Sequence, residues 1–90
     1  MINKFRGANR FLSNFYETSV EWEGLIYPSS EAAFQAAKTL DQEDRKRFQT
    51  MTPVEAKREG YRVTLREDWE DIKLHVMYEV VLAKFSQNEF

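Results

Sequence analysis

Apolar residues recur at helical spacing in the C-terminal third of the chain. Between residues 69 and 83 they fall every three or four positions, at Trp69, Ile72, Val76, Val80 and Ala83, with Met77 and Val81 beside them. This pattern predicts a long helix that buries one face. Asp68 directly precedes the stripe and is a residue type that caps helix N-termini. We therefore expect the helix to begin next to Asp68.

The N-terminal third carries the patterns of short strands. Ile2 to Phe5 predicts one strand, and the aromatic segment RFLSNFY, residues 10–16, predicts an irregular turn. A hairpin is expected around the pair Glu23-Gly24, with Pro28 ending its second strand. The apolar residues of this hairpin are Val20, Trp22, Leu25, Ile26 and Tyr27.

Three shorter helices are predicted from their start signals. Ser29 can cap a helix from about residue 30 to 39, and Asp41 can cap a charged helix from about 42 to 49. The stretch TPVE, residues 52–55, combines a capping Thr, a Pro at the first helical position and a Glu that can complete a capping box. The helix that it opens should end near Gly60.

These elements predict an α+β fold that is mostly helical, with short N-terminal strands packed on the helices. The chain has 90 residues and is 42% hydrophobic, which suits one domain over residues 1–90. We expect Phe34 to join the apolar face of the long helix in the core. The absence of cysteine excludes disulfides, thiolate catalysis and cysteine-based zinc sites.

Charge and hydropathy limit the partners of the chain. The net charge of -2 gives no general attraction to nucleic acid, so an anionic ligand must be held by a local basic site. No apolar run approaches the ~20 residues that span a bilayer, and the N-terminus lacks the pattern of a signal peptide. These features predict a soluble, cytoplasmic protein without a membrane partner.

One predicted helix carries three polar residues on a single face. Glu31, Gln35 and Lys38 fall within an arc of roughly 60°, and alanines fill most of the remaining surface. The stripe is either the solvated face of an amphipathic helix or the wall of a pocket. Glu31 lies in the first turn, where the helix dipole favours an ionised carboxylate. Periodicity alone leaves both interpretations open.

Three motifs resemble the NADAR family, also called YbiA-like, over nearly the whole chain. They are FLSNFY (11–16), YPS.E...QA.K (27–38) and REDW...K..VM......KF.QN (66–88). Members of this family are N-glycosidases, associated with riboflavin-pathway intermediates and with removal of ADP-ribose from modified guanine bases. The resemblance favours the pocket interpretation.

The resemblance also implies a role for each polar residue of the motifs. Glu31 is the expected catalytic carboxylate, and the expected substrate-binding residues are Ser13, Asn14, Phe15, Gln35 and Lys38. A carboxylate suits this reaction because breaking a C–N glycosidic bond develops positive charge on the sugar. A phosphate needs a cation such as Lys38, and a base can stack on Phe15. No cofactor or metal is required, and we expect the lone His75 to be a solvated helix residue.

The chain departs from the family pattern at two positions and at its end. Many relatives have His where this chain has Ala32, and a basic residue where it has Tyr61. Relatives continue past the KFSQN segment, so we expect the domain to be truncated at its C-terminus relative to the family. The alternatives are a fragment, a naturally shortened protein, or a chain completed by a partner.

Three classes of function follow from these features. The first is a metal-independent N-glycosidase that acts on an ADP-ribose-type or riboflavin-pathway nucleotide. The second is a non-catalytic module that binds ADP-ribose or NAD-like nucleotides. The third is an assembly domain that self-associates through the surface left by the missing segment. The expected partner of the first two classes is a nucleotide-sugar or an ADP-ribosylated substrate, with nucleic acid only as a modified substrate.

Overall fold

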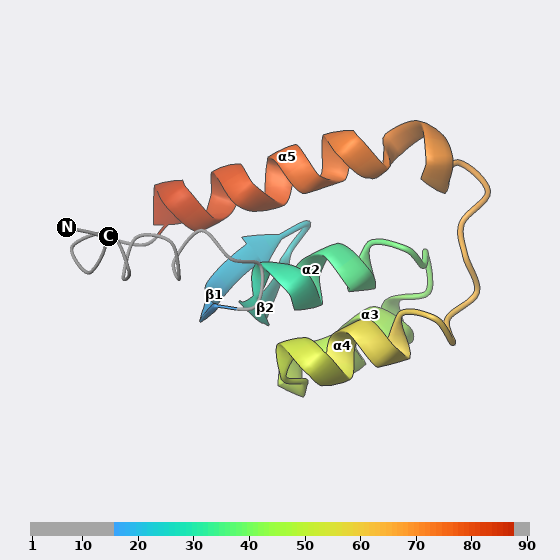
Figure 1. Cartoon of the computed structure of the whole chain (residues 1–90), viewed down its shortest axis with the longest axis horizontal. Coiled ribbons are helices and arrows are strands. Elements are labelled where there is room, and N and C mark those ends of the chain that lie inside the picture. Colours follow the sequence, from blue (N-terminus) through green and yellow to red (C-terminus); the bar gives the residue numbers. More distant parts are fainter. Residues whose placement is uncertain (1–15, 88–90) are drawn as a thin grey trace, which may run out of the picture.

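A β-hairpin and four helices follow one another along residues 16–87, which are the residues that the structure, a computed structural model, describes (Figure 1). The elements are β1 (Glu17–Trp22), β2 (Leu25–Ser29), α2 (Ser30–Ala36), α3 (Gln42–Arg47), the 3-10 helix η1 (Phe48–Thr50), α4 (Pro53–Glu59) and α5 (Trp69–Gln87). The α+β, mostly helical prediction is confirmed. The predicted strand at residues 2–5 and the turn at 10–15 lie outside the described residues.

The hairpin turns at the two predicted residues. Its strands are antiparallel, and Trp22 pairs with Leu25 across the turn. Glu23 and Gly24 have φ values of 47° and 86°, the left-handed conformation that a two-residue hairpin turn requires. Glycine at the second position adopts this conformation without steric cost.

The prediction that Pro28 ends the second strand is wrong by one residue, because β2 runs on to Ser29. The register between β1 and β2 is irregular between Glu17 and Val20, opposite this part of β2. A proline, which has no N–H to donate, is tolerated at such an irregularity. Ser29 therefore serves both as the last strand residue and as the cap of the next helix.

The capping signals predict the helix starts correctly. The Ser29 hydroxyl accepts a hydrogen bond from the Ala32 N–H, and the Asp41 carboxylate accepts from two amides of α3. Thr52 and Glu55 form the reciprocal capping box at the start of α4. α5 begins directly after Asp68, whose carboxylate accepts two bonds from the Arg66 guanidinium.

Two helices end earlier than the sequence predicts. α2 ends at Ala36 because the next amides, of Lys38 and Thr39, bond to carbonyls three residues back instead of four. α3 likewise ends at Arg47 and continues as η1. Such tightening of the last turn is a common way to satisfy terminal carbonyl groups.

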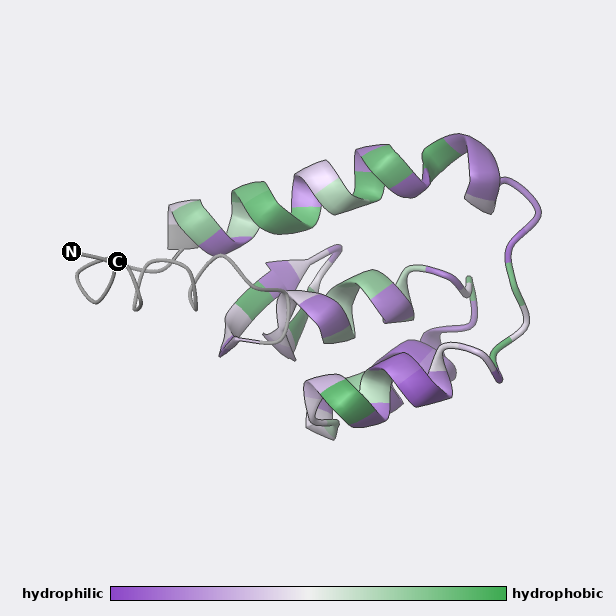
Figure 2. Ribbon diagram, in the orientation of Figure 1, coloured by the Kyte–Doolittle hydropathy of each residue, from purple (hydrophilic) through white to green (hydrophobic). Residues whose placement is uncertain are grey.

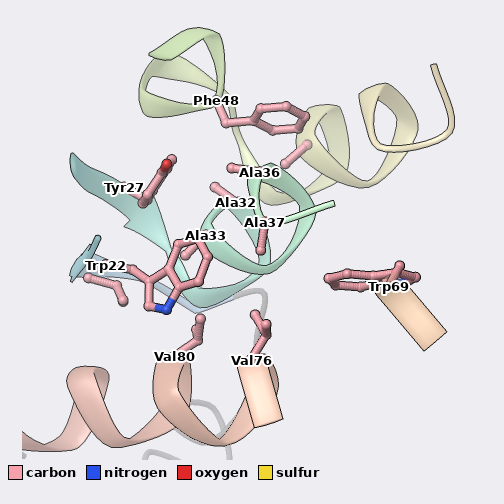
Figure 3. Close-up of a cluster of buried hydrophobic side chains, with 12 residues drawn as sticks. Trp22, Tyr27, Ala32, Ala33, Ala36, Ala37, Phe48, Trp69, Val76 and Val80 are labelled. Atoms are coloured by element: carbon pink, nitrogen blue, oxygen red, sulfur yellow. The ribbon is translucent and has the colours of Figure 1, made fainter. Parts of the chain in front are cut away.

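α2 lies at the centre of the fold, between α5 on one side and α3 and α4 on the other (Figure 1). It contacts β1, β2, α4, α5 and η1. Figure 3 shows Val76 and Val80 of α5 pointing toward α2 and the hairpin, while Phe48 approaches from the opposite side. The buried apolar residues are Val20, Trp22, Tyr27, Ala32, Ala33, Ala36, Ala37, Phe48, Ala56, Trp69, Val76 and Val80.

The predicted core face of α5 is confirmed. Trp69, Val76 and Val80 are buried, and Ile72 is half-buried against the core. The Trp69 ring packs on the ring of Phe34, which is also half-buried, with centroids 5.1 Å apart and planes tilted by 58°. This tilted geometry is favourable for aromatic pairs.

Apolar residues also line the outer face of α5, so that hydrophobic positions recur along the whole helix (Figure 2). Leu74, Tyr78 and Leu82 are 80%, 65% and 53% exposed. They are four residues apart and therefore share one face. No helix within residues 16–87 has the length and apolar content needed to cross a membrane.

A buried arginine that the sequence pattern does not predict ties α3 to the hairpin. Arg45 is only 3% exposed, and its Nε donates to the Thr39 carbonyl oxygen at 2.8 Å. Its guanidinium also pairs with Glu23 at 2.9 Å and lies 5.0 Å from the centre of the Trp22 ring. These contacts satisfy the buried cation.

Replacing Trp69 with alanine is expected to lower the free energy of unfolding by about 3–5 kcal/mol, because it empties the space between α2 and α5. Urea denaturation followed by circular dichroism measures this change. The matched control, His75→Ala, removes an exposed ring from the same helix and should change stability by less than about 0.5 kcal/mol. A Trp69→Ala protein of native stability that no longer binds ligand would instead place Trp69 in the binding site.

Candidate functional site

Helix α2 brings the Glu31 carboxylate and the Gln35 amide into direct contact. The Gln35 Nε2 donates a hydrogen bond to Glu31 Oε2 at 2.6 Å. Glu31 is 6% exposed and Gln35 is 5% exposed. The interpretation of the stripe as a solvated helix face is therefore wrong for these two residues.

The two oxygens of the Glu31 carboxylate are in different situations. Oε2 is held by Gln35, one turn along the same helix. Oε1 accepts no hydrogen bond from another residue in the part of the chain that the structure describes. Within residues 16–87 the carboxylate is thus held by a hydrogen bond at one of its two oxygens.

Lys38 completes the stripe just beyond the end of α2. Burial lowers the pKa of Lys38, and the negative charge of Glu31 partly offsets this effect. The Lys38 Nζ lies 5.3 Å from the centre of the Tyr61 ring, which follows α4. The ammonium group is thus half-buried, within electrostatic reach of Glu31, and supported by an aromatic face.

Ser13, Asn14 and Phe15, the predicted facing loop, lie outside the described residues. A cleft between this loop and Glu31 stays a prediction. Gln35 and Lys38 are the predicted binding residues that the structure does place, and both lie beside Glu31.

Two cavities bordered by described residues lie away from Glu31 and Gln35. A cavity of about 640 Å³ begins right after Lys38, where Thr39, Leu40, Asp41 and Asp44 face residues 64–68. A second cavity, of about 520 Å³, is lined by Arg47, Thr50, Met51, Glu55, Arg58, Glu59 and Arg62. Neither cavity is lined by a residue of the polar stripe.

The acidic and histidine side chains of residues 16–87 form no cluster of three or more that could hold a metal ion. His75, the lone histidine, lies on α5 with its Nε2 at 3.2 Å from Glu79 Oε2. Its side chain is 69% exposed, so the prediction that it is a solvated helix residue is confirmed.

Two further residues contact the polar stripe without having been predicted to do so. Gly60 lies against the Gln35 amide, and Tyr61 lies under the Lys38 ammonium group. Both come from the end of α4, more than 20 residues away in sequence. No local pattern indicates contacts over such a separation, although Tyr61 stands out as a departure from the family pattern.

Comparison with known proteins identifies relatives that match most of this chain. The chain is 37% identical to N-glycosidase YbiA of Escherichia coli (strain K12) over 79 residues, which are 84% of this chain and 49% of that protein. It is 38% identical to riboflavin biosynthesis protein VVA0006 of Vibrio vulnificus (strain YJ016) over 81 residues, which are 87% of this chain and 22% of that protein.

The fold has a counterpart among solved structures. The NMR structure of the E. coli protein YbiA superposes with a TM-score of 0.74 and 36% sequence identity, covering 87% of this chain and 48% of YbiA. The chain therefore spans about half the length of the YbiA relatives that it matches. Residues 3–90 match the NADAR domain, and the chain belongs to this family.

Proposed function

We propose that this chain carries the catalytic carboxylate of an N-glycosidase that acts on an ADP-ribose-type or riboflavin-pathway nucleotide. The observation that carries the proposal is the buried Glu31 carboxylate, which Gln35 holds at one oxygen. The relatives named N-glycosidase YbiA and riboflavin biosynthesis protein support the reaction class.

The proposed reaction needs a negative charge beside the sugar. The C–N bond breaks with its electron pair going to the base nitrogen, and the sugar carbon develops positive charge. A water molecule then adds its oxygen to that carbon and supplies the proton that the released base takes up. Glu31 stabilises the cationic sugar and accepts the proton from the attacking water before passing it on.

Lys38 is the proposed partner of a substrate phosphate or ribose oxygen. Its ammonium group donates no hydrogen bond to another described residue, although it lies close to Glu31 and Tyr61. An ammonium group with free donors, held at a fixed place, suits a phosphate.

The outer face of α5 favours a second candidate function, self-association with another copy of this chain. Leu74, Tyr78 and Leu82 form an exposed apolar stripe, which is unusual on the surface of a helix that already buries its other face. Pairing of two such stripes would remove them from water in both copies.

Replacing Glu31 with glutamine is expected to lower kcat by about 100-fold or more, because the side chain keeps its shape but loses its charge. The assay measures free base released from an ADP-ribosylated guanine nucleotide and from riboflavin precursors. Substrate affinity and melting temperature should stay close to native. The control, Glu70→Gln, removes an exposed first-turn glutamate from α5 and should leave kcat unchanged.

Unchanged turnover in the Glu31→Gln protein would refute the catalytic role. A native chain that is thermally stabilised by these ligands but releases no base would identify the non-catalytic nucleotide-binding module instead.

Replacing Lys38 with alanine is expected to weaken binding of phosphorylated ligands by roughly 10-fold, because a hydrogen bond to a charged group contributes about 1.5–3 kcal/mol. Binding of the corresponding nucleosides should change much less. Calorimetric titration with each phosphorylated ligand and its nucleoside measures the two changes in affinity. The control is Lys46→Ala, which removes an exposed ammonium group from α3. Equal losses for both ligand types would leave Lys38 as a helix-surface charge.

Replacing Leu74 with aspartate is expected to shift self-association to at least 10-fold higher protein concentration, since it places a charge within an apolar contact. Sedimentation velocity over a concentration series measures this shift. The neighbouring control, His75→Asp, adds the same charge at a solvated position and should have little effect. A native chain that stays monomeric at all concentrations would contradict the assembly function.

A further inference from the structure

A side chain at Gly60, the residue that ends α4, would overlap the amide of Gln35. A Cβ atom built on Gly60 would lie 1.9 Å from Gln35 Oε1 and 2.8 Å from Gln35 Cδ. The φ of Gly60 is -58°, an ordinary helical value that every residue type adopts. The close approach of Gln35, and not the backbone conformation, therefore distinguishes glycine from other residues at this position.

The Gln35 amide is held between two neighbours. Its Nε2 donates to Glu31 Oε2, while its Oε1 is buried against Gly60 and has no hydrogen-bond partner among residues 16–87. A side chain at residue 60 would displace the far end of Gln35, because the overlap falls on the amide itself. Such a displacement moves the donor away from Glu31 and breaks a 2.6 Å bond.

The two residues that follow α4 thus contact two of the three residues of the polar stripe. Gly60 lies against Gln35, and the adjacent Tyr61 lies against Lys38. α4 and α2 also pack directly on each other. The end of α4 is therefore a second wall of the site, although it is distant from Glu31 in sequence.

We propose that Gly60 is a positioning residue for Glu31. The absence of a side chain at residue 60 keeps open the space in which the Gln35 amide lies, and the amide in turn holds Glu31 Oε2. Gly60 acts only through Gln35 and touches neither substrate nor water in the reaction. This inference rests on the proposed function, in which Glu31 is the reacting carboxylate.

The test uses Gly60→Ala, Gln35→Ala and the double variant in the 90-residue chain. Gly60→Ala should lower kcat by up to about 100-fold, the scale of loss that a misplaced reacting group causes. In the Gln35→Ala background the same change should have no further effect, because the space is already empty. Gly60→Ala in the Gln35→Ala protein therefore serves as the matched control, because it shows any effect that alanine has on α4 without Gln35.

A spectroscopic measurement follows the contact without requiring turnover. The side-chain amide protons of Gln35 should resonate downfield and exchange slowly with water in the native chain, because one of them is bound to a carboxylate. Both signatures should be lost in Gly60→Ala while the backbone spectrum keeps the native dispersion.

The outcomes separate this inference from the proposed function. An unchanged Gln35 resonance in Gly60→Ala, or losses of kcat that add fully in the double variant, would overturn the positioning role. If Glu31→Gln leaves turnover unchanged while Gly60→Ala still moves the Gln35 resonance, the proposed function fails and the positioning of Gln35 by Gly60 stands.

Discussion

The fold depends on a central helix that must pack on nearly all of its sides. α2 contacts both strands of the hairpin, α4, α5 and η1, so its surface allows only short side chains at most positions. Alanine at residues 32, 33, 36 and 37 meets this requirement, and all four are fully buried (Figure 3). A larger residue at any of these positions would force neighbouring elements apart, because protein interiors leave few voids.

The same constraint explains why the polar residues of α2 are buried. A carboxylate that is 6% exposed needs a hydrogen-bond partner, and Gln35 supplies one. Stability alone does not require this pair, since apolar residues of similar size usually pack as well in a buried site. The Gln35 carbonyl oxygen is also buried without a hydrogen-bond partner among the described residues, an arrangement that generally lowers stability by about 1–3 kcal/mol. This cost is one reason for proposing a functional site at Glu31.

Local signals were sufficient to predict where the helices begin. The caps at Ser29, Asp41 and Thr52 are determined by side chains within three residues of each helix start, so the sequence contains all the information needed. The turn at Glu23-Gly24 is equally local. Helix ends were predicted less well, because a switch to bonds three residues apart leaves no comparable mark in the sequence.

Contacts between residues far apart in the sequence determine the features that the sequence pattern does not predict. Whether the stripe of Glu31 and Gln35 faces solvent depends on which elements cover α2, and no periodicity carries that information. The contact of Gly60 with Gln35 is of the same kind, as is the burial of Arg45 within a charged helix. The facing loop at residues 13–15 stays a prediction.

Among residues 16–87, aromatic rings lie beside Arg45, Lys84 and Lys38, and the remaining contacts of Arg45 and Lys38 differ. Arg45 lies over Trp22, Lys84 over Tyr16 and Lys38 over Tyr61, at 5.0, 5.7 and 5.3 Å from the ring centres. Arg45 also binds the Thr39 carbonyl and Glu23, so its donors are used within the fold. Lys38 has the aromatic contact but makes no hydrogen bond to another described residue. A ring face stabilises a cation without occupying its N–H donors, which is one reason why we propose Lys38 as the partner of a substrate anion beside Glu31.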